Sequence, residues 1–220
     1  IKSGHNPPRL ASSMGKADFM EPTVKTHITM NSSKYNGVVV PMVTPVTPSG
    51  FLDKSAVERI IKSFVSAGVS PLLMGPTGEG NSVSTMDGQE LIETAVKAAD
   101  GKITVYAGLT GNCFIEQLKQ AGYYSASGAD VIVATLPSYY SLTPEQMENY
   151  YLRLADSIKG PLMLYNIAAT THMSIPVDVI ERLSRHENIV GLKDSERDLE
   201  RMEQCISIAR NRDDFAYFCG

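Results

Sequence analysis

The sequence predicts an α/β protein, specifically a (β/α)8 barrel of the TIM type that stops after its seventh strand. From residue 37 onward, short apolar runs rich in β-branched residues alternate with longer segments of helical periodicity. The runs are continuously apolar, as expected for parallel strands covered on both faces. Strands are expected at residues 38–44, 71–75, 103–108, 130–135, 161–165, 189–193 and 215–218.

The regular spacing of these strands favours a closed barrel over an open sheet. Their starts are separated by 33, 32, 27, 31, 28 and 26 residues, the length of one strand, one helix and two short loops. A dinucleotide-binding sheet would instead place a G-x-G-x-x-G turn after its first strand. Residues 44–50 read Thr-Pro-Val-Thr-Pro-Ser-Gly, which gives no such turn. The eighth strand that a barrel requires is missing, so we expect an apparently truncated barrel domain over residues 35–220.

Residues 1–34 differ from the rest of the chain. They mix Pro, Gly, Ser and Lys without sustained periodicity. They also carry five Lys or Arg residues against Asp18 and Glu21, and form no obvious amphipathic helix. We expect a disordered leader or a processing remnant here.

Six helices are expected in the gaps between strands, and three of them have explicit signals. Apolar residues recur at three- and four-residue spacing in the first, which should end at Gly68, and in the third, which should end near Gly128. Before the fourth, Thr143, Pro144 and Gln146 form a capping-box pattern. The expected buried faces are Val57, Ile60, Ile61, Phe64 and Val65; Ile115, Leu118, Ala121 and Gly122; and Met147, Tyr150, Tyr151 and Leu154.

Composition excludes several classes of function. The 220 residues are 43% hydrophobic and 20% charged, with a net charge of −4, so no basic field attracts nucleic acid or an anionic membrane. No apolar stretch approaches the length of a membrane span. Cys113, Cys205 and Cys219 are scattered and fit neither a disulfide framework nor paired metal ligands. We therefore expect a cytoplasmic protein with no metal and no cofactor.

Two strand ends suggest covalent chemistry. The sixth expected strand ends on Lys193, and the fifth ends on Tyr165. A desolvated amine loses its proton more readily and can attack a carbonyl, and a nearby phenol can move protons. A lysine at a strand end is also commonly solvated or paired, here with Asp194 or Asp198, which are expected to pair or to cap the next helix. The carboxyl ends of all strands meet at one mouth in a barrel, so the fold decides between these interpretations.

The turn after the second strand is a further candidate. Residues 75–80 read Gly-Pro-Thr-Gly-Glu-Gly, and the N–H groups of Thr77 and Gly78 with the Thr77 hydroxyl could bind a carboxylate. The alternative is an ordinary βα turn. Glu79 is expected to be buried under this turn and to accept backbone hydrogen bonds, because a carboxylate there would repel a carboxylate substrate.

Four motifs in order resemble the dihydrodipicolinate synthase and N-acetylneuraminate lyase family over residues 37–220. They are Gly-Pro-Thr-Gly-Glu at 75–79, Tyr-Tyr at 139–140, Tyr-Asn at 165–166 and Gly-Leu-Lys-Asp-Ser at 191–195. The resemblance implies a barrel that usually assembles as a homotetramer. It also implies a Schiff base between the lysine and the keto carbon of pyruvate or a pyruvate-derived substrate.

The resemblance assigns a role to each matching residue. Lys193 would be the catalytic Schiff-base nucleophile, and Tyr165 the catalytic proton shuttle that also orients the substrate. Thr77 would hold the substrate carboxylate, and Tyr140 would match the tyrosine that reaches into the site of a neighbouring subunit. Gly220 would match the glycine that lies close to bound substrate after the seventh strand.

Two departures from the family pattern affect the choice of substrate. Pro76 stands where the synthases carry a Thr or Ser whose hydroxyl relays protons, and proline has neither a hydroxyl nor an N–H. Thr170 stands where they carry an arginine that binds a second carboxylate. Losing that clamp favours a hydroxylated, sugar-acid-like substrate over aspartate semialdehyde. Thr170, Thr171 and Ser195 could contact such hydroxyls, or could be ordinary surface residues.

The main functional hypothesis is a class I lyase or aldolase that forms a Lys193 imine with pyruvate or a 2-keto sugar acid and cleaves or forms a carbon–carbon bond. One alternative is a 4-hydroxy-tetrahydrodipicolinate synthase. A second alternative, motivated by Pro76 and the missing eighth strand, is a non-catalytic barrel paralogue or an inactive fragment. The expected partners are a small-molecule 2-keto acid and further copies of the chain, as a dimer or tetramer.

Overall fold

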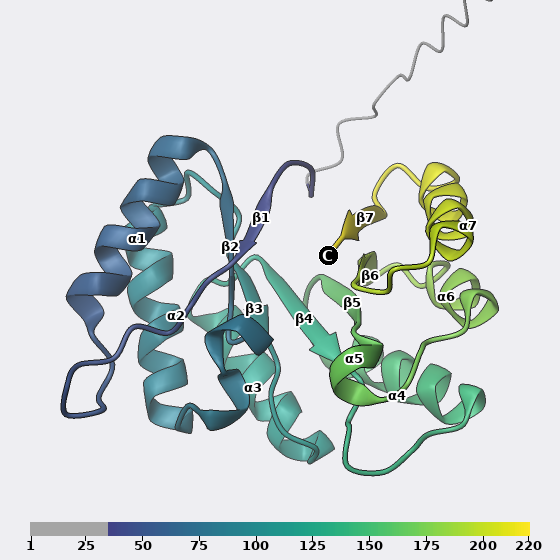
Figure 1. The fold of residues 1–220 in the computed structure, drawn as a ribbon, viewed down its shortest axis with the longest axis horizontal. Coiled ribbons are helices and arrows are strands. Elements are labelled where there is room, and N and C mark those ends of the chain that lie inside the picture. Colours follow the sequence, from purple (N-terminus) through teal and green to yellow (C-terminus); the bar gives the residue numbers. More distant parts are fainter. Residues whose placement is uncertain (1–34) are drawn as a thin grey trace, which may run out of the picture. The chain divides into compact units, whose positions relative to one another are not determined.

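A computed structural model describes residues 35–220, so the leader expected at residues 1–34 lies outside the described residues. Seven strands form one sheet in the order of the sequence, and each neighbouring pair is parallel. The predicted class and strand order are confirmed (Figure 1). The strands are β1 (Val39–Pro41), β2 (Ser70–Leu73), β3 (Tyr106–Gly108), β4 (Val131–Thr135), β5 (Leu162–Asn166), β6 (Ile189–Asp194) and β7 (Ala216–Cys219).

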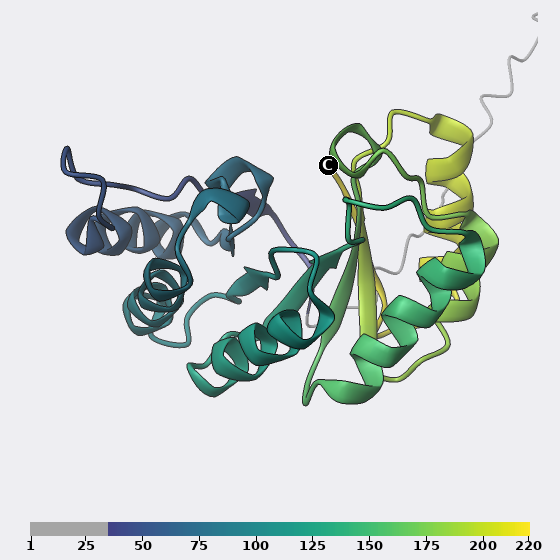
Figure 2. The ribbon, with the colours of Figure 1, turned by 90° about the horizontal axis from the view of Figure 1, so that it is seen from below.

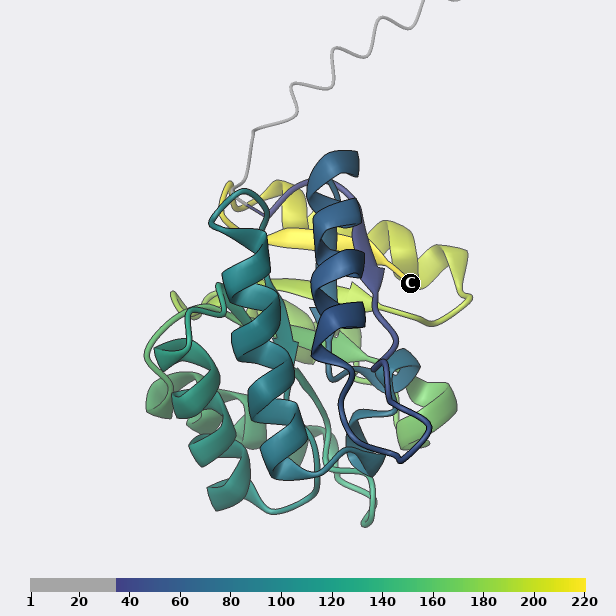
Figure 3. The ribbon, with the colours of Figure 1, turned by 90° about the vertical axis from the view of Figure 1, so that its left-hand side faces the viewer.

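Helices surround the outside of this curved sheet (Figures 1 and 2), and α1 and α2 run side by side (Figure 3). None of the helices within residues 35–220 has the length and apolar character of a membrane span. The α-helices are α1 (Lys54–Ala67), α2 (Thr85–Ala99), α3 (Phe114–Ala126), α4 (Pro144–Ser157), α5 (Ala168–Thr171), α6 (Val177–Leu183) and α7 (Leu199–Arg210). Two 3-10 helices, η1 (Pro76–Gly78) and η2 (Gly80–Ser82), follow β2.

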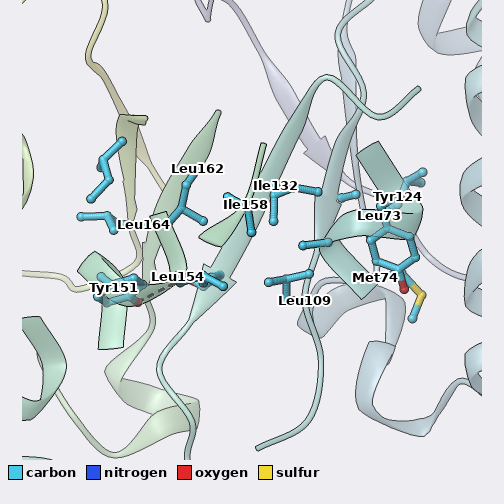
Figure 4. Close-up of a cluster of buried hydrophobic side chains, with 14 of the residues drawn as sticks. Leu73, Met74, Leu109, Tyr124, Ile132, Tyr151, Leu154, Ile158, Leu162 and Leu164 are labelled. Carbon is cyan, nitrogen blue, oxygen red and sulfur yellow. Dashed lines mark hydrogen bonds between the residues drawn. The ribbon is translucent and has the colours of Figure 1, made fainter. Parts of the chain in front are cut away.

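Alternating strand residues build two apolar clusters. One cluster lies between the sheet and its helices and includes Leu73, Ile132 and Leu164 (Figure 4). The other lies on the opposite face of the strands, inside the curve of the sheet. It contains Leu72, Tyr106, Val131, Val133, Met163, Tyr165, Val190 and Ala216. Because neighbouring strand residues point to opposite faces, the side chain at 165 faces the interior while those at 164 and 166 face the helices.

The first and fourth helices agree with their sequence signals. Val57 and Ile61 are buried in α1, and Gly68 ends that helix in the left-handed conformation with φ 65°. Both bonds of the predicted capping box are present at the start of α4. Tyr151 on α4 is fully buried and donates its hydroxyl proton to the carbonyl of Ala134 at 3.1 Å (Figure 4). These local signals therefore place α1 and α4 correctly against the sheet.

The buried face predicted for the third helix is wrong in part. Ile115 is 57% exposed and Gly122 is also exposed, whereas Gln117, Ala121 and Tyr124 are buried. The amide of Gln117 explains the rotation, because it donates to the Gly111 carbonyl at 2.9 Å and accepts from the Tyr150 hydroxyl at 3.0 Å. A polar side chain with two fixed partners thus occupies a position that periodicity alone assigns to solvent.

Two strand boundaries and the number of helices between β5 and β6 also differ from expectation. β1 is shorter than the predicted 38–44 run, because the chain turns into a hairpin-like loop bridged at Val46 and Leu52. β3 begins three residues late, since the N–H of Val105 donates to the Asp130 carboxylate at 2.9 Å. Between β5 and β6 the structure has two helices, α5 and α6, where one was expected. Side-chain hydrogen bonds and loop geometry, which apolar patterns do not encode, account for the first two changes.

Burial of Cys205 on α7 should make the protein sensitive to alkali. Burial raises the pKa of this thiol from its ordinary value of 9 to about 11. The unfolded chain releases the thiol proton near pH 9 and the native chain retains it, so this contribution to stability is complete below pH 9 and is lost as pH rises towards 11. Between these pH values, the free energy of unfolding should fall more in the wild type than in Cys205→Ala, as measured by urea unfolding. Equal pH slopes for the two proteins would contradict this assignment.

Candidate active site

The pairing of β5 with β6 brings Lys193 and Tyr165 together. The two residues are direct neighbours in the register of the strands. Lys193 Nζ lies 4.2 Å from the centroid of the Tyr165 ring, on its face. Tyr165 is only 6% exposed, and Lys193 is partly buried. The amine therefore lies over the face of a buried aromatic ring, and this contact fixes its position.

Lys193 lines a cavity of about 340 Å³ inside the curve of the sheet. Leu72, Met163 and Phe218 contribute apolar walls, and Tyr106 packs edge-to-face on Phe218 with ring centroids 6.1 Å apart. Burial raises the pKa of Tyr106 well above its usual value, and burial with a smaller effect of Asp194 raises the pKa of Tyr217 to about 12. These two phenols remain neutral near pH 7, so neither supplies a negative charge to the cavity.

A second cavity, of about 240 Å³, shares Leu72 and Val133 with the first and has Tyr165 in its wall. Its lining contains no Lys, Arg or His, and Glu79 is its one charged residue. Neutral polar side chains make up much of the remainder: Asn81, Ser82, Thr110, Thr135, Ser138, Thr170 and Thr171. This second cavity therefore offers hydroxyl and amide groups in place of a cation. We call it the polar cavity after these side chains.

The turn after β2 is tightly packed. The N–H of Gly78 donates to the Gly75 carbonyl at 3.1 Å, and the Gly78 carbonyl accepts from the Thr44 hydroxyl at 2.7 Å. A Cβ at position 78 would lie 2.8 Å from the Met42 carbonyl oxygen, so only glycine fits. The Gly78 N–H is thus already used within the turn. Thr77 is exposed, and within residues 35–220 its hydroxyl has no hydrogen-bond partner, although it lines neither cavity.

The expectation for Glu79 is wrong. Its side chain is exposed instead of buried, and it borders the polar cavity. The residue adopts the left-handed conformation with φ 52°, between the two 3-10 helices. This geometry costs roughly 1–2 kcal/mol for a non-glycine residue.

The remaining sequence-derived candidates fall in different places. Tyr140 is 75% exposed, packs edge-to-face on Tyr139 and lines neither cavity. Thr171 lines the polar cavity but is buried, and its hydroxyl donates to the Ile167 and Met173 carbonyls at 3.2 and 3.0 Å. Gly220 follows β7, and its N–H donates to the Asp194 carbonyl at 2.8 Å. Lys193, Tyr165 and Gly220 thus gather around adjacent strand ends, whereas Tyr140 lies apart.

A polar network behind the lysine was largely missed by the sequence analysis. We call Asn166, Asp194, Glu196 and Arg201 the anchor. Asp194 is 1% exposed and accepts from Arg201 Nε at 2.7 Å and from Asn166 Nδ2 at 2.8 Å. The expected pairing of Asp194 is thereby confirmed, and Asp198 caps α7 as expected. Asn166 and Asp194 end β5 and β6, Glu196 lies in the loop after β6, and Arg201 lies in the first turn of α7. Their side chains come together only in the folded protein.

The described residues contain no arrangement suited to a metal. No group of three or more His, Cys, Asp or Glu side chains within residues 35–220 is placed to bind one. The cysteines at 113, 205 and 219 are all free thiols. The linings of the two cavities supply the amine of Lys193, the phenol of Tyr165, the carboxylate of Glu79 and neutral polar groups.

Comparison with known proteins agrees with this architecture. The model of the Dihydrodipicolinate synthetase family matches residues 34–220. The Escherichia coli protein named Probable 2-dehydro-3-deoxy-D-pentonate aldolase YjhH is 32% identical over 85% of this chain. A 4-hydroxy-tetrahydrodipicolinate synthase from Exiguobacterium sibiricum is 28% identical over 84% of it. The chain spans 63% of the length of each of these two relatives.

Solved structures give the same result. Dihydrodipicolinate synthase DapA-2 from Bacillus anthracis superposes with a TM-score of 0.81 at 27% identity, covering 86% of this chain and 64% of that one. The E. coli prophage protein YagE, solved in complex with pyruvate, gives a TM-score of 0.81 at 26% identity with the same coverage. The seven strands described here therefore correspond to part of a TIM barrel in those structures. Fold, motifs and family match together show that the chain belongs to the dihydrodipicolinate synthetase family.

Proposed function

We propose that the protein acts as a class I aldolase or lyase through an imine between Lys193 and pyruvate or a 2-keto sugar acid. The observation that carries the proposal is the position of Lys193 Nζ, 4.2 Å from the centroid of the Tyr165 ring and in the lining of a cavity of about 340 Å³. An amine must lie beside a proton-transfer group and away from bulk water for this chemistry. The names of the relatives, an aldolase and synthases, support the same class.

The reaction follows from the chemistry of the two residues. The neutral amine of Lys193 attacks the keto carbon, and the Tyr165 hydroxyl donates the proton with which the keto oxygen leaves as water, which gives a protonated imine and a Tyr165 phenolate. When the C3–C4 bond breaks, its electron pair moves towards the imine and forms an enamine, while the C4 hydroxyl gives its proton to the Tyr165 oxygen and becomes an aldehyde. Proton return to C3 and hydrolysis then release pyruvate and regenerate the amine. Condensation is the same sequence in reverse.

The polar cavity favours a hydroxylated partner over a dicarboxylic one. None of its lining residues is a cation, and Thr170 occupies the wall where the synthases use an arginine. An unpaired substrate carboxylate there would lose hydration without gaining a counter-charge, whereas sugar hydroxyls could exchange hydrogen bonds with threonine, serine and asparagine side chains. The named activity of the YjhH relative, on a 2-dehydro-3-deoxy-pentonate, is consistent with this class.

The remaining site assignments belong to the same proposal. Thr77 would hold the substrate carboxylate through its free hydroxyl, with Gly78 shaping the turn, and Thr171 and Gly220 would border the substrate. Tyr140, exposed beside Tyr139, would contact a second copy of the chain in a homo-oligomer. One solved relative is described as a monomeric synthase variant, so oligomeric state varies among the relatives. The three free thiols support a reducing compartment such as the cytoplasm.

Borohydride trapping tests the imine directly. Wild-type protein incubated with pyruvate and sodium borohydride should gain the mass of one reduced pyruvate, located on Lys193 by peptide mass spectrometry. Lys193→Ala should gain none, because the nucleophile is lost, and Lys62→Ala, which removes an exposed lysine of α1, should react like the wild type. Absence of an adduct on wild-type Lys193 would favour the non-catalytic alternative.

Substituting Thr170 tests the substrate class. Wild type should cleave 2-keto-3-deoxy sugar acids with a higher kcat/KM than it condenses pyruvate with aspartate semialdehyde. Thr170→Arg should lower kcat/KM for the sugar acid about tenfold, roughly 1.4 kcal/mol, and raise it for aspartate semialdehyde, because the new guanidinium can pair with a second carboxylate. Thr170→Ser is the matched control and should resemble the wild type. Preference of the wild type for aspartate semialdehyde would instead establish the synthase alternative.

A further inference from the structure

We propose that Arg201 and Asp194 are positioning residues, which hold Lys193 over the ring of Tyr165 without touching the substrate themselves. The proposal rests on the proposed function for its catalytic consequence. Its structural content, the location of the lysine relative to the ring, stands independently of any reaction.

The anchor lies directly behind the two residues of the site. Asn166 follows Tyr165 on β5, Asp194 follows Lys193 on β6, and both pairs are opposite each other in the strand register. Successive strand residues point to opposite faces, so the anchor side chains face the helices while Lys193 and Tyr165 face the interior. A displacement of the Asp194 backbone therefore moves Lys193 by a comparable amount.

Arg201 fixes the end of β6 from α7. Its Nε lies 2.7 Å from Asp194 Oδ2 and 2.9 Å from Glu196 Oε2, so one guanidinium nitrogen meets two carboxylates. The other Asp194 oxygen accepts from Asn166 Nδ2 at 2.8 Å and from the Glu196 N–H at 3.1 Å. The Asp194 carboxylate is thus held by donors from β5, from α7 and from its own loop.

A bulge at the start of the β5–β6 pairing sets the register that the anchor holds. The register shifts between Leu162 and Met163, which pair with Ile189 and Gly191 respectively. A Cβ at Gly191 would lie 2.6 Å from the Ala216 carbonyl oxygen, so the strand is also crowded on its β7 side. The extra residue of β6 at this bulge puts Lys193, and not Leu192, opposite Tyr165, and the anchor holds the end of the strand in that register.

Stability alone does not explain these residues. Burying charged groups costs several kcal/mol per ion before pairing, and apolar replacements of buried ion pairs are often neutral or stabilising. Arg201 Nη2 is buried and has no hydrogen-bond partner among the described residues. Retaining a partly satisfied guanidinium at this depth makes physical sense when it holds a geometry that apolar packing cannot specify.

The anchor also reaches the wall of the polar cavity. Glu196 Oε2 accepts from the Ser174 hydroxyl at 2.6 Å and from Asn166 Nδ2 at 2.7 Å, and Asn166 Oδ1 accepts from the N–H of Ile175 at 3.0 Å. Ser174 and Ile175 lie three and four residues after the end of α5, the helix that carries Thr170. One hydrogen-bond network therefore connects β6, which carries Lys193, to the segment after β5 that lines the polar cavity.

Two measurements on the purified protein test the proposal. The first is the NMR shift of the Lys193 ε-methylene protons, which the Tyr165 ring current moves upfield in the wild type, with Lys193→Arg used for assignment. The second is the rate of borohydride trapping with pyruvate. Arg201→Met and the isosteric Asp194→Asn should lose the upfield shift and react about 10- to 100-fold more slowly, as expected when a supporting residue is removed. Arg201→Lys should recover part of both.

The matched control is Arg182→Met, which removes an exposed arginine paired with Glu148 and Asp178 on the helical surface. It should retain the wild-type shift and rate. A folded Arg201→Met or Asp194→Asn protein with both readouts unchanged would overturn the proposal; Asp194→Asn decides if Arg201→Met does not fold. Failure of the wild type to react with pyruvate would remove the proposed function, yet the NMR shift would still decide the positioning role.

Discussion

The parallel pairing of β5 with β6 is the constraint on which the site depends. It places Tyr165 opposite Lys193 in register and turns both side chains to the interior of the sheet. A one-residue slip would move the lysine to the helix-facing side and bring Asp194 inside. The contact between the amine and the ring follows from this register, as does the place of each residue in the lining of one of two adjoining cavities.

The two faces of the sheet have different roles at the ends of β5 and β6: the interior face lines the cavities, and the helix-facing side holds the backbone in place. On the interior side, the cavity beside Lys193 and the polar cavity beyond Tyr165 adjoin each other, with Leu72 and Val133 in both linings. On the helix side, the anchor holds the same strand ends with charge-assisted hydrogen bonds. Because different side chains line the cavities and hold the strand ends, cavity residues can differ between substrates while the backbone keeps its position. A fixed barrel scaffold can support many chemistries in this way.

Much of this arrangement could be predicted from sequence because it is encoded in periodicity. Seven apolar runs at near-equal spacing identify the strands, and the residues that end them, Lys193 and Tyr165, must then meet at one mouth. What could not be predicted depends on side-chain hydrogen bonds between distant segments. Gln117 rotates α3 through its bonds to Gly111 and Tyr150, and Arg201 finds Asp194 only once α7 packs behind β6.

A crystal structure of the protein soaked in pyruvate would show directly whether Lys193 forms an imine with the keto carbon beside Tyr165. We expect continuous electron density from Lys193 Nζ to the ligand, with the Tyr165 hydroxyl beside it and the anchor bonds to Asp194 intact. Pyruvate bound without a link to Lys193, or with Lys193 displaced from the Tyr165 ring in the liganded and unliganded crystals alike, would contradict it.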